Sequence, residues 1–397
     1  MQQNSELRKL KSRIDWFCKS KVNAFSPTIS PAPKSAERKE IESIYEAVYY
    51  FLRNGVSQLV VQRKYMGSYC DIYLHKNIED TYFVSRNGFR IEHISKEEAL
   101  NACKEIYKKL DWSTMELAII QSELMPWSTL GKGLIENEFR GYLTVHKNHF
   151  NELKNSELYH KIEQVKKSEE YKNFISFTSS HSEKEVAKKY PAHIIRQYAS
   201  VENFTIKNLE AYKQGIDIYE EQIAHFGKTE KMFFKPFNIL KKVYEDGTEI
   251  LVNDNLSYQE VNDDGLLYLE EINEKNVDII IEEIYAWYKT LNAENEEGIV
   301  IKPRKAFIKN IPPAFKIRND QYLTMIYGVN FLEDYDYYLR KRKIERKLQC
   351  SINDWMINWE LLKVPYAEIK SDNYYLKNLV YDRIMGEKAE INLDRRL

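Results

Sequence analysis

The chain has 397 residues, 43% of them hydrophobic and 30% charged, which is typical of a globular protein with more than one module around a large core. Its formal net charge of −1 excludes binding to nucleic acid through overall charge, so any such binding must use a local basic groove. The four cysteines are scattered and form no CxxC pair, which argues against a zinc site or a disulfide framework and fits a reducing cytosol. There is no run of ~18 apolar residues and no signal-peptide core, so we expect a cytoplasmic protein without a membrane span.

The first hundred residues alternate between helix and strand signals. Apolar residues at helical spacing predict helices at 7–17 and 41–52, and three prolines keep the loop at 26–33 extended. The β-branched run at 59–61 predicts a buried strand that leads directly to Lys64. Gly67 and Ser68 then supply a turn. Further strands are expected at 69–75, 82–85 and 89–93, the last two forming a hairpin around Arg86-Asn87-Gly88.

The rest of the chain has a helical middle and a helical end. A capping-box pattern opens a helix at 95–110, and a strand is expected at 115–124. Charged sequence of helical period at about 131–229 predicts a helical insertion. We then expect strands at 232–234, 249–252, 298–303 and 314–317, a helix at 277–291, a continuation of the sheet at 322–327, and helices from 331 onward. The basic run at 340–347 is interpreted as a solvated helix face, although contact with RNA phosphates is the alternative.

Three short clusters share one chemical character. Lys64 ends a strand; Glu297 and Lys302 flank the apolar strand of E-G-I-V-I-K-P; and Lys316 and Arg318 share one strand face, because side chains alternate with period two. Lysines that converge with a carboxylate on one sheet suit a nucleotide triphosphate, since the cations bind phosphates and the acid binds a divalent metal. Taken alone, K-Y-M-G-S is equally compatible with an exposed hairpin turn.

The order of the motifs resembles that of the covalent nucleotidyltransferases. In detail the chain is similar to the ligase domain of bacterial polynucleotide kinase-phosphatase, the Pnkp-type ATP-dependent RNA ligase of RNA repair. The resemblance runs almost end to end, from S-P-T-I-S-P to the closing L-D-R-R-L. It is carried by K-Y-M-G-S (Lys64–Ser68), S-E-L-M-P-W-S (Ser122–Ser128), K-P-F-N-I-L (Lys235–Leu240), E-G-I-V-I-K-P (Glu297–Pro303) and F-K-I-R-N-D-Q-Y-L-T-M-I-Y-G (Phe315–Gly328).

The resemblance implies a role for each matching residue. Lys64 matches the nucleophile that takes AMP from ATP as a lysyl-AMP. Arg86 and Glu123 match ribose contacts, and Phe237 matches the aromatic ring that packs on adenine. Glu297 matches the acid that assists metal-dependent transfer, with Mg²⁺ or Mn²⁺ as the metal. Lys302, Lys316 and Arg318 match phosphate contacts.

Each role has a structural alternative. Arg86 is compatible with an incidental basic residue of an Asn-Gly hairpin, Glu123 with a simple lysine partner, and Phe237 with a core position beside Phe233 and Phe234. A free lysine needs about 4–5 kcal/mol to lose its proton at neutral pH, a cost that neighbouring cations and partial burial lower.

The chain departs from the family pattern at a few positions. Tyr69 stands where the family has an arginine after Met-Gly-Ser, and Gln62-Arg63 replaces the usual acidic pair before the lysine. Asp320 stands where a second arginine follows Arg318 in the relatives. These replacements put individual ribose or phosphate contacts in doubt.

We therefore expect an α+β protein with a nucleotidyltransferase core of antiparallel sheets at 1–140 and 230–330, a helical insert at 141–229 and a helical C-terminal module at 331–397. The predicted function is ATP-dependent RNA ligation, in which AMP passes from Lys64 to an RNA 5′-phosphate that is then joined to a 3′-hydroxyl. The resemblance implies as partners a separate 5′-kinase/3′-phosphatase chain and a 3′-terminal RNA ribose 2′-O-methyltransferase. The alternatives are an RNA-capping guanylyltransferase and a catalytically weak subunit that binds RNA ends as a scaffold.

Overall fold

The computed structural model describes residues 2–25, 27–130, 133, 135–227 and 231–397. Two five-stranded sheets form its centre, with the strand orders β1-β10-β9-β2-β8 and β4-β3-β5-β6-β7. All strand pairs are antiparallel except β1 with β10. The strands are β1 Ser30–Pro31, β2 Leu59–Lys64, β3 Ser68–His75, β4 Tyr82–Ser85, β5 Met115–Met125, β6 Phe233–Tyr244, β7 Glu249–Leu251, β8 Leu266–Leu269, β9 Gly298–Pro303 and β10 Phe315–Arg318.

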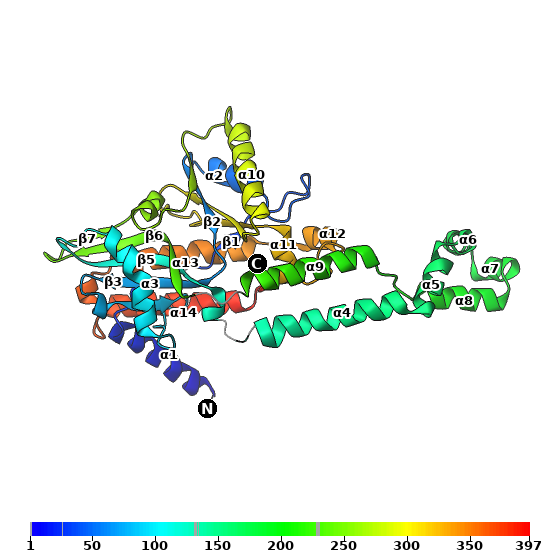
Figure 1. Cartoon of the computed structure of the whole chain (residues 1–397), viewed down its shortest axis with the longest axis horizontal. Coiled ribbons are helices and arrows are strands. Elements are labelled where there is room, and N and C mark those ends of the chain that lie inside the picture. Colours follow the sequence, from blue (N-terminus) through cyan, green and yellow to red (C-terminus); the bar gives the residue numbers. More distant parts are fainter. Residues whose placement is uncertain (1, 26, 131–132, 134, 228–230) are drawn as a thin grey trace.

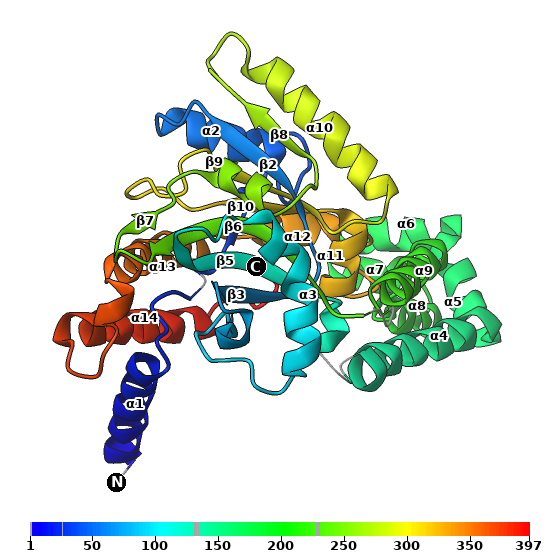
Figure 2. The same ribbon diagram turned by 60° about the vertical axis from the view of Figure 1, so that its left-hand side comes forward.

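Helices cover both sheets, which confirms the α+β class (Figures 1 and 2). They are α1 Gln2–Lys19, α2 Ile44–Arg53, α3 Lys96–Lys109, α4 Arg140–Asn155, α5 Glu157–Lys167, α6 Glu169–Thr178, α7 Glu183–Lys189, α8 Ala192–Glu202, α9 Leu209–Phe226, α10 Val277–Ala293, α11 Asp320–Tyr327, α12 Tyr335–Lys341, α13 Glu345–Lys363 and α14 Tyr374–Ile391. None of the helices in the described ranges is long and apolar enough to cross a membrane.

The period-two alternation of the strands divides the core. In the second sheet Cys70, Ile72 and Leu74 face α3, whereas Tyr73 faces a cluster built from α1, α13 and α14. The second sheet is therefore covered on both faces. The first sheet packs its apolar face against α2 and α10, which lie side by side above it (Figure 2).

The helical insertion is an arm that projects from the sheets. Helices α4 and α9 run side by side, and α5 to α8 lie at the far end (Figure 1). At its base, Tyr212 and Ile216 of α9 pack with Tyr322 and Met325 of α11. The helical character predicted for 131–229 is confirmed for the described part, while residues 131, 132, 134, 228 and 229 lie outside the described residues.

Two predicted strands are wrong. Residues 322–327 form helix α11, which Asn319 caps by accepting a hydrogen bond from the backbone amide of Tyr322. The tyrosines and isoleucine of this stretch favour a strand locally, but the cap and the contact with α9 override that preference. Residues 89–93 make only a single bridge, Val84 with Arg90, after the predicted turn at Gly88 (φ 78°). Strands β1 and β8 were not predicted.

Strand register brings the chemical residues together at one point. Lys64 at the end of β2 is paired with Gly298, which begins β9, and Gly298 is paired with Arg318 of β10. The φ of Gly298 is 149°, and a Cβ atom placed there would lie 2.0 Å from the carbonyl oxygen of Ile317. A glycine is therefore required for the three strands to meet at this position.

Replacing Gly298 by alanine should destabilise the protein by about 1–3 kcal/mol, because the side chain needs both an unfavourable φ and displacement of β10. The control is Gly265→Ala, where an added Cβ meets no atom within 4 Å. Thermal melting of the two variants checks the prediction. Equal melting temperatures would contradict the close approach of β9 to β10.

Candidate active site

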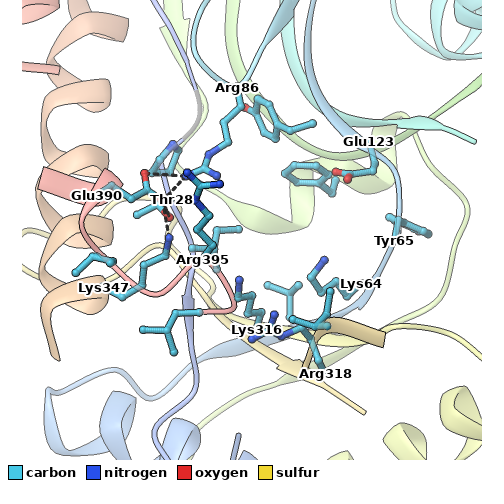
Figure 3. Close-up of a pocket in the computed structure, with 18 of the residues that line it drawn as sticks. Thr28, Lys64, Tyr65, Arg86, Glu123, Lys316, Arg318, Lys347, Glu390 and Arg395 are labelled. Atoms are coloured by element: carbon cyan, nitrogen blue, oxygen red, sulfur yellow. Dashed lines mark hydrogen bonds and ion pairs between the residues drawn. The ribbon is translucent and has the colours of Figure 1, made fainter. Parts of the chain in front are cut away.

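A cavity of about 670 Å³ opens between the two sheets and the C-terminal helices. Its wall contains all but one of the residues predicted from the motifs: Lys64, Arg86, Glu123, Phe237, Lys302, Lys316 and Arg318. The remaining residue, Glu297, lies behind this wall and forms an ion pair with Lys64. In Figure 3, Lys64, Lys316 and Arg318 lie together on one side, and Arg86 lies with the C-terminal residues on another. The structure thus brings together residues that are up to 254 positions apart, from Lys64 to Arg318.

Lys64 is held by a carboxylate at the base of this wall. Its Nζ atom lies 2.7 Å from Oε2 of Glu297, and 23% of the lysine side chain is exposed compared with 2% for the glutamate. The buried carboxylate therefore orients a lysine that is still accessible from the cavity. The hydroxyl of Tyr322 donates a hydrogen bond to Glu297, and burial together with that acidic neighbour raises the pKa of Tyr322 well above its usual value.

Glu123 is the second carboxylate beside Lys64. Its Oε1 accepts a hydrogen bond from the backbone amide of Gly67 at 3.3 Å. A Cβ atom at Gly67 would lie 2.6 Å from the side chain of Glu123, which explains why the turn after Lys64 uses glycine. Burial raises the pKa of Glu123 to about 7, with Lys64 opposing the shift and Glu297 adding to it.

Phe237 forms an aromatic wall together with Tyr69. The two ring centroids are 6.0 Å apart, and Nζ of Lys302 lies 4.8 Å from the centroid of Phe237. Lys302 donates to the carbonyl oxygen of Phe237 at 3.3 Å, and burial lowers its pKa to about 7. Phe237 thus lines the cavity, whereas Phe234 belongs to the core under the second sheet. This arrangement presents one ring and one titratable amine to a ligand.

Tyr69 stands in place of the arginine of the family pattern and takes part in a hydrogen-bond network. Its hydroxyl donates to Asp71 Oδ1 at 2.5 Å and accepts from the side-chain amide of Gln121 at 3.0 Å. Burial raises the pKa of Asp71 to about 7, although the hydrogen bond from Tyr69 opposes the shift. The position therefore carries a half-buried tyrosine that is hydrogen-bonded to a buried carboxylate.

The two cations of β10 differ in what binds them. Burial and the charge of Arg318 lower the pKa of Lys316 well below its usual value, and Lys64 adds to the repulsion. The Lys316 amine makes no hydrogen bond or ion pair with any residue of the described ranges. Arg318, in contrast, forms an ion pair with buried Glu42 at 2.5 Å. Lys316 is consequently the cation that a ligand can engage without breaking an internal bond.

Glu42 connects the cavity floor to the C-terminal module. It binds Arg318 from β10 and Arg342 from the segment after α12, and all three side chains are at least 95% buried. Burial alone would raise the pKa of Glu42, but Arg318 and Arg342 lower it below its usual value. Nothing in the sequence pattern identified Glu42, because its two partners lie 276 and 300 residues away.

The sequence also did not indicate that residues near the C-terminus line the cavity. Glu390 of α14 accepts hydrogen bonds from Thr28 at 2.7 Å and from Arg86 at 2.8 Å, and it also binds Lys347. Burial would raise the pKa of Glu390, but Arg86 and Lys347 hold it at about 2. Arg395 follows on the same wall (Figure 3). Arg86 is therefore bound to a carboxylate rather than presented freely, and no local pattern in residues 387–397 signals this placement.

The carboxylates beside Lys64 fit a divalent ion that takes some of its ligands from the protein and the others from water and a substrate. Glu297 and Glu123 both influence the same lysine, and their negative charges interact with each other. Within the described ranges no group of three or more acidic, histidine or cysteine side chains could hold a metal. Mg²⁺ commonly uses one or two carboxylates, with water and phosphate oxygens as the other ligands. Two carboxylates beside the cavity meet that requirement.

Comparisons with known proteins agree with this geometry. The model of the PNKP adenylyltransferase domain, ligase domain, matches residues 19–369. A chain of the solved structure of the Pnkp1/Rnl/Hen1 RNA repair complex is 52% identical and has a TM-score of 0.93, with 98% of this chain and 99% of that chain covered. A second structure of the Pnkp1/Rnl/Hen1 complex gives the same identity and coverage and a TM-score of 0.91. No curated protein matches the sequence.

A family model that spans most of the chain, and solved relatives that are similar over almost their whole length, agree on one assignment. The chain belongs to the PNKP adenylyltransferase (ligase) domain family.

Proposed function

We propose that the chain is the ATP-dependent RNA ligase of an RNA-repair system and that Lys64 is the amine that carries AMP. The observation that supports this proposal most strongly is the position of Lys64. It is paired with Glu297 at 2.7 Å, on the wall of a cavity that also contains Lys302, Lys316 and an aromatic ring. A partly accessible lysine among cations is suited to attack a phosphate, because the same cations bind the triphosphate.

The reaction follows from these positions in three steps. The neutral Lys64 amine forms a bond to the α-phosphorus of ATP, pyrophosphate leaves, and the lysine proton is released. A 5′-phosphate oxygen of RNA then displaces the lysine, which gives an RNA–adenylate. Finally the 3′-hydroxyl of a second end attacks that phosphate, the phosphodiester bond forms, and AMP leaves. Positioning and neutralisation of phosphate charge supply most of the rate enhancement in such transfers.

The chain's own residues prepare the first step. Glu297 orients the lysine, and Lys316 lies on the same cavity wall, where its amine can contact a phosphate of the nucleotide. Phe237 offers its face to a base, and Lys302 lies against the same ring. Glu297 and Glu123 would hold Mg²⁺ or Mn²⁺, which when bound would neutralise phosphate charge.

The proposed partners follow from the solved relatives. Their chains are components of Pnkp1/Rnl/Hen1 complexes, and the similarity extends over 98% of this chain. We therefore propose that this ligase works in the cytoplasm with a separate 5′-kinase/3′-phosphatase and a 3′-terminal RNA ribose 2′-O-methyltransferase, on RNA ends that carry a 5′-phosphate and a 3′-hydroxyl.

Incubation of the purified chain with ATP labelled at the α-phosphate, in the presence of Mg²⁺ or Mn²⁺, should leave label on the denatured protein. Lys64→Ala should reduce this label to below about one thousandth, because the attacking atom is removed. The matched control is Lys242→Ala, since Lys242 also lies on a strand, is 19% exposed and pairs with Glu260 at 2.6 Å.

The control variant should retain full labelling, since Lys242 does not line the cavity. Labelling from GTP in place of ATP would contradict the proposed substrate and favour a guanylyltransferase. Sealing of RNA ends by a repair complex that contains Lys64→Ala would contradict the catalytic assignment and favour a scaffold.

Binding of ATP should take up a proton through Lys302. Its pKa of about 7 means that the free protein holds a mostly neutral amine at pH 8, and a nearby triphosphate favours the charged form. In a Lys64→Ala background, calorimetry in buffers of different ionisation enthalpy should show uptake approaching one proton per ATP, and affinity should fall as pH rises from 7 to 9. Lys302→Met should remove most of the uptake. Equal uptake with and without Lys302 would place this lysine away from the phosphates.

A further inference from the structure

A second cavity, of about 540 Å³, lies beside the first and is lined mainly by cations. We name it the basic groove. It contains six cationic side chains and two carboxylates, together with exposed and half-buried tyrosines. The lining residues are Tyr327, Tyr337, Tyr338, Lys341, Arg342, Lys343, Glu345, Arg346, Lys347, Asn392, Leu393, Asp394, Arg396 and Leu397.

Half of these cations are already bound within the protein. Arg342 binds Glu42, Lys347 binds Glu390, and Arg396 binds Asp394. These pairs fix the shape of the groove but leave little charge for a ligand.

The other three cations are available. The side chains of Lys341, Lys343 and Arg346 are exposed, and none makes a hydrogen bond or ion pair with another residue of the described ranges. Among the carboxylates, Asp394 is bound by Arg396, so Glu345 alone opposes the three cations. A local excess of positive charge in a chain whose formal net charge is −1 points to an anionic ligand.

Two further features favour a nucleic-acid strand over a small anion. The α13 helix begins at Glu345 without a side-chain cap, so the positive end of its dipole lies at the groove, where Glu345 and Arg346 form the wall. Tyr337 is 52% exposed in the same lining, which provides a ring face on which a base can stack. Cations beside an exposed aromatic ring are a combination that binds single-stranded nucleic acid.

The groove adjoins the candidate active site. Lys347, Leu393, Asp394 and Leu397 line both cavities, so the last turns of the chain separate the two spaces. Arg396 is fixed on the groove side over the rings of Tyr327 and Tyr338, at 4.7 and 5.6 Å, while Arg395 lines the cavity that contains Lys64. A strand that lies in the groove therefore has its end next to the cavity.

We propose that the basic groove binds the phosphodiester backbone of the single-stranded RNA whose 5′-phosphate receives AMP. The identity of the polymer rests on the proposed function. Phosphate contacts come from Lys341, Lys343 and Arg346, and Tyr337 stacks on a base. The groove holds the strand, and the 5′ end extends past residues 393–397 toward Lys64.

The test compares the full chain with the triple variant Lys341→Ala/Lys343→Ala/Arg346→Ala for binding of a 5′-phosphorylated single-stranded RNA, without ATP, by fluorescence anisotropy at several salt concentrations. Loss of three phosphate contacts should weaken binding at least tenfold and reduce the slope of log K against log salt by about 2, since each contact on a single strand contributes about 0.7. Tyr337→Ala should weaken binding at every salt concentration without changing the slope.

The matched control removes the same charge elsewhere. Lys104, Lys275 and Lys309 are exposed and lie outside both cavities, so their triple alanine variant should bind RNA as the wild type does. Equal affinity and slope for the wild type and the groove variant would overturn the proposal. If that variant instead failed to bind a protein partner, the groove would be a protein-binding surface. Labelling of the wild type by ATP alone tests the proposed function separately, because the RNA measurement requires no nucleotide.

Discussion

The candidate site depends on the antiparallel pairing of β2 with β9. This pairing places Lys64 opposite Gly298, so that the preceding residue, Glu297, reaches the lysine amine. Gly298 in turn allows β10 to approach, which brings Lys316 and Arg318 to the same end of the sheet. A shift of one residue in this register would turn alternate side chains to the other face and separate the lysine from its acid. The chemistry is thus a consequence of strand register at a single point.

The C-terminal helices complete the cavity through ion pairs. Glu42 fixes β10 to the segment after α12, and Glu390 fixes α14 to Arg86, Thr28 and Lys347. Glu42 and its two arginines are buried, so removing one of these partners costs about 3–5 kcal/mol because another charge remains unpaired. These pairs therefore hold the C-terminal module against the sheets and shape both the cavity and the basic groove, so that this module is part of the site rather than an appendage to it.

Local sequence signals predicted the helices and strands whose formation depends on residues close to one another in the chain. The strand before Lys64, the capped helix at 95–110 and the helical arm follow from apolar spacing and capping, and the motif order placed Lys64, Glu123, Phe237, Lys302 and Lys316 on one cavity wall. The sequence predicts a strand at 322–327 because several of its side chains favour strands, whereas the helix depends on the Asn319 cap and on packing against α9. Glu42 and Glu390 could not be predicted, since their roles come from partners hundreds of residues away that only the folded chain brings together.

The most direct test of the account is to identify the lysine that carries AMP. Lys302 is the alternative candidate for the nucleophile, because burial lowers its pKa to about 7 and it lines the same cavity as Lys64. After incubation with ATP and a divalent metal, digestion of the protein and mass spectrometry of its peptides should place a single AMP on Lys64 and none on Lys302. An AMP adduct on Lys302, or on any lysine outside the cavity, would contradict the assignment of Lys64 as the nucleophile.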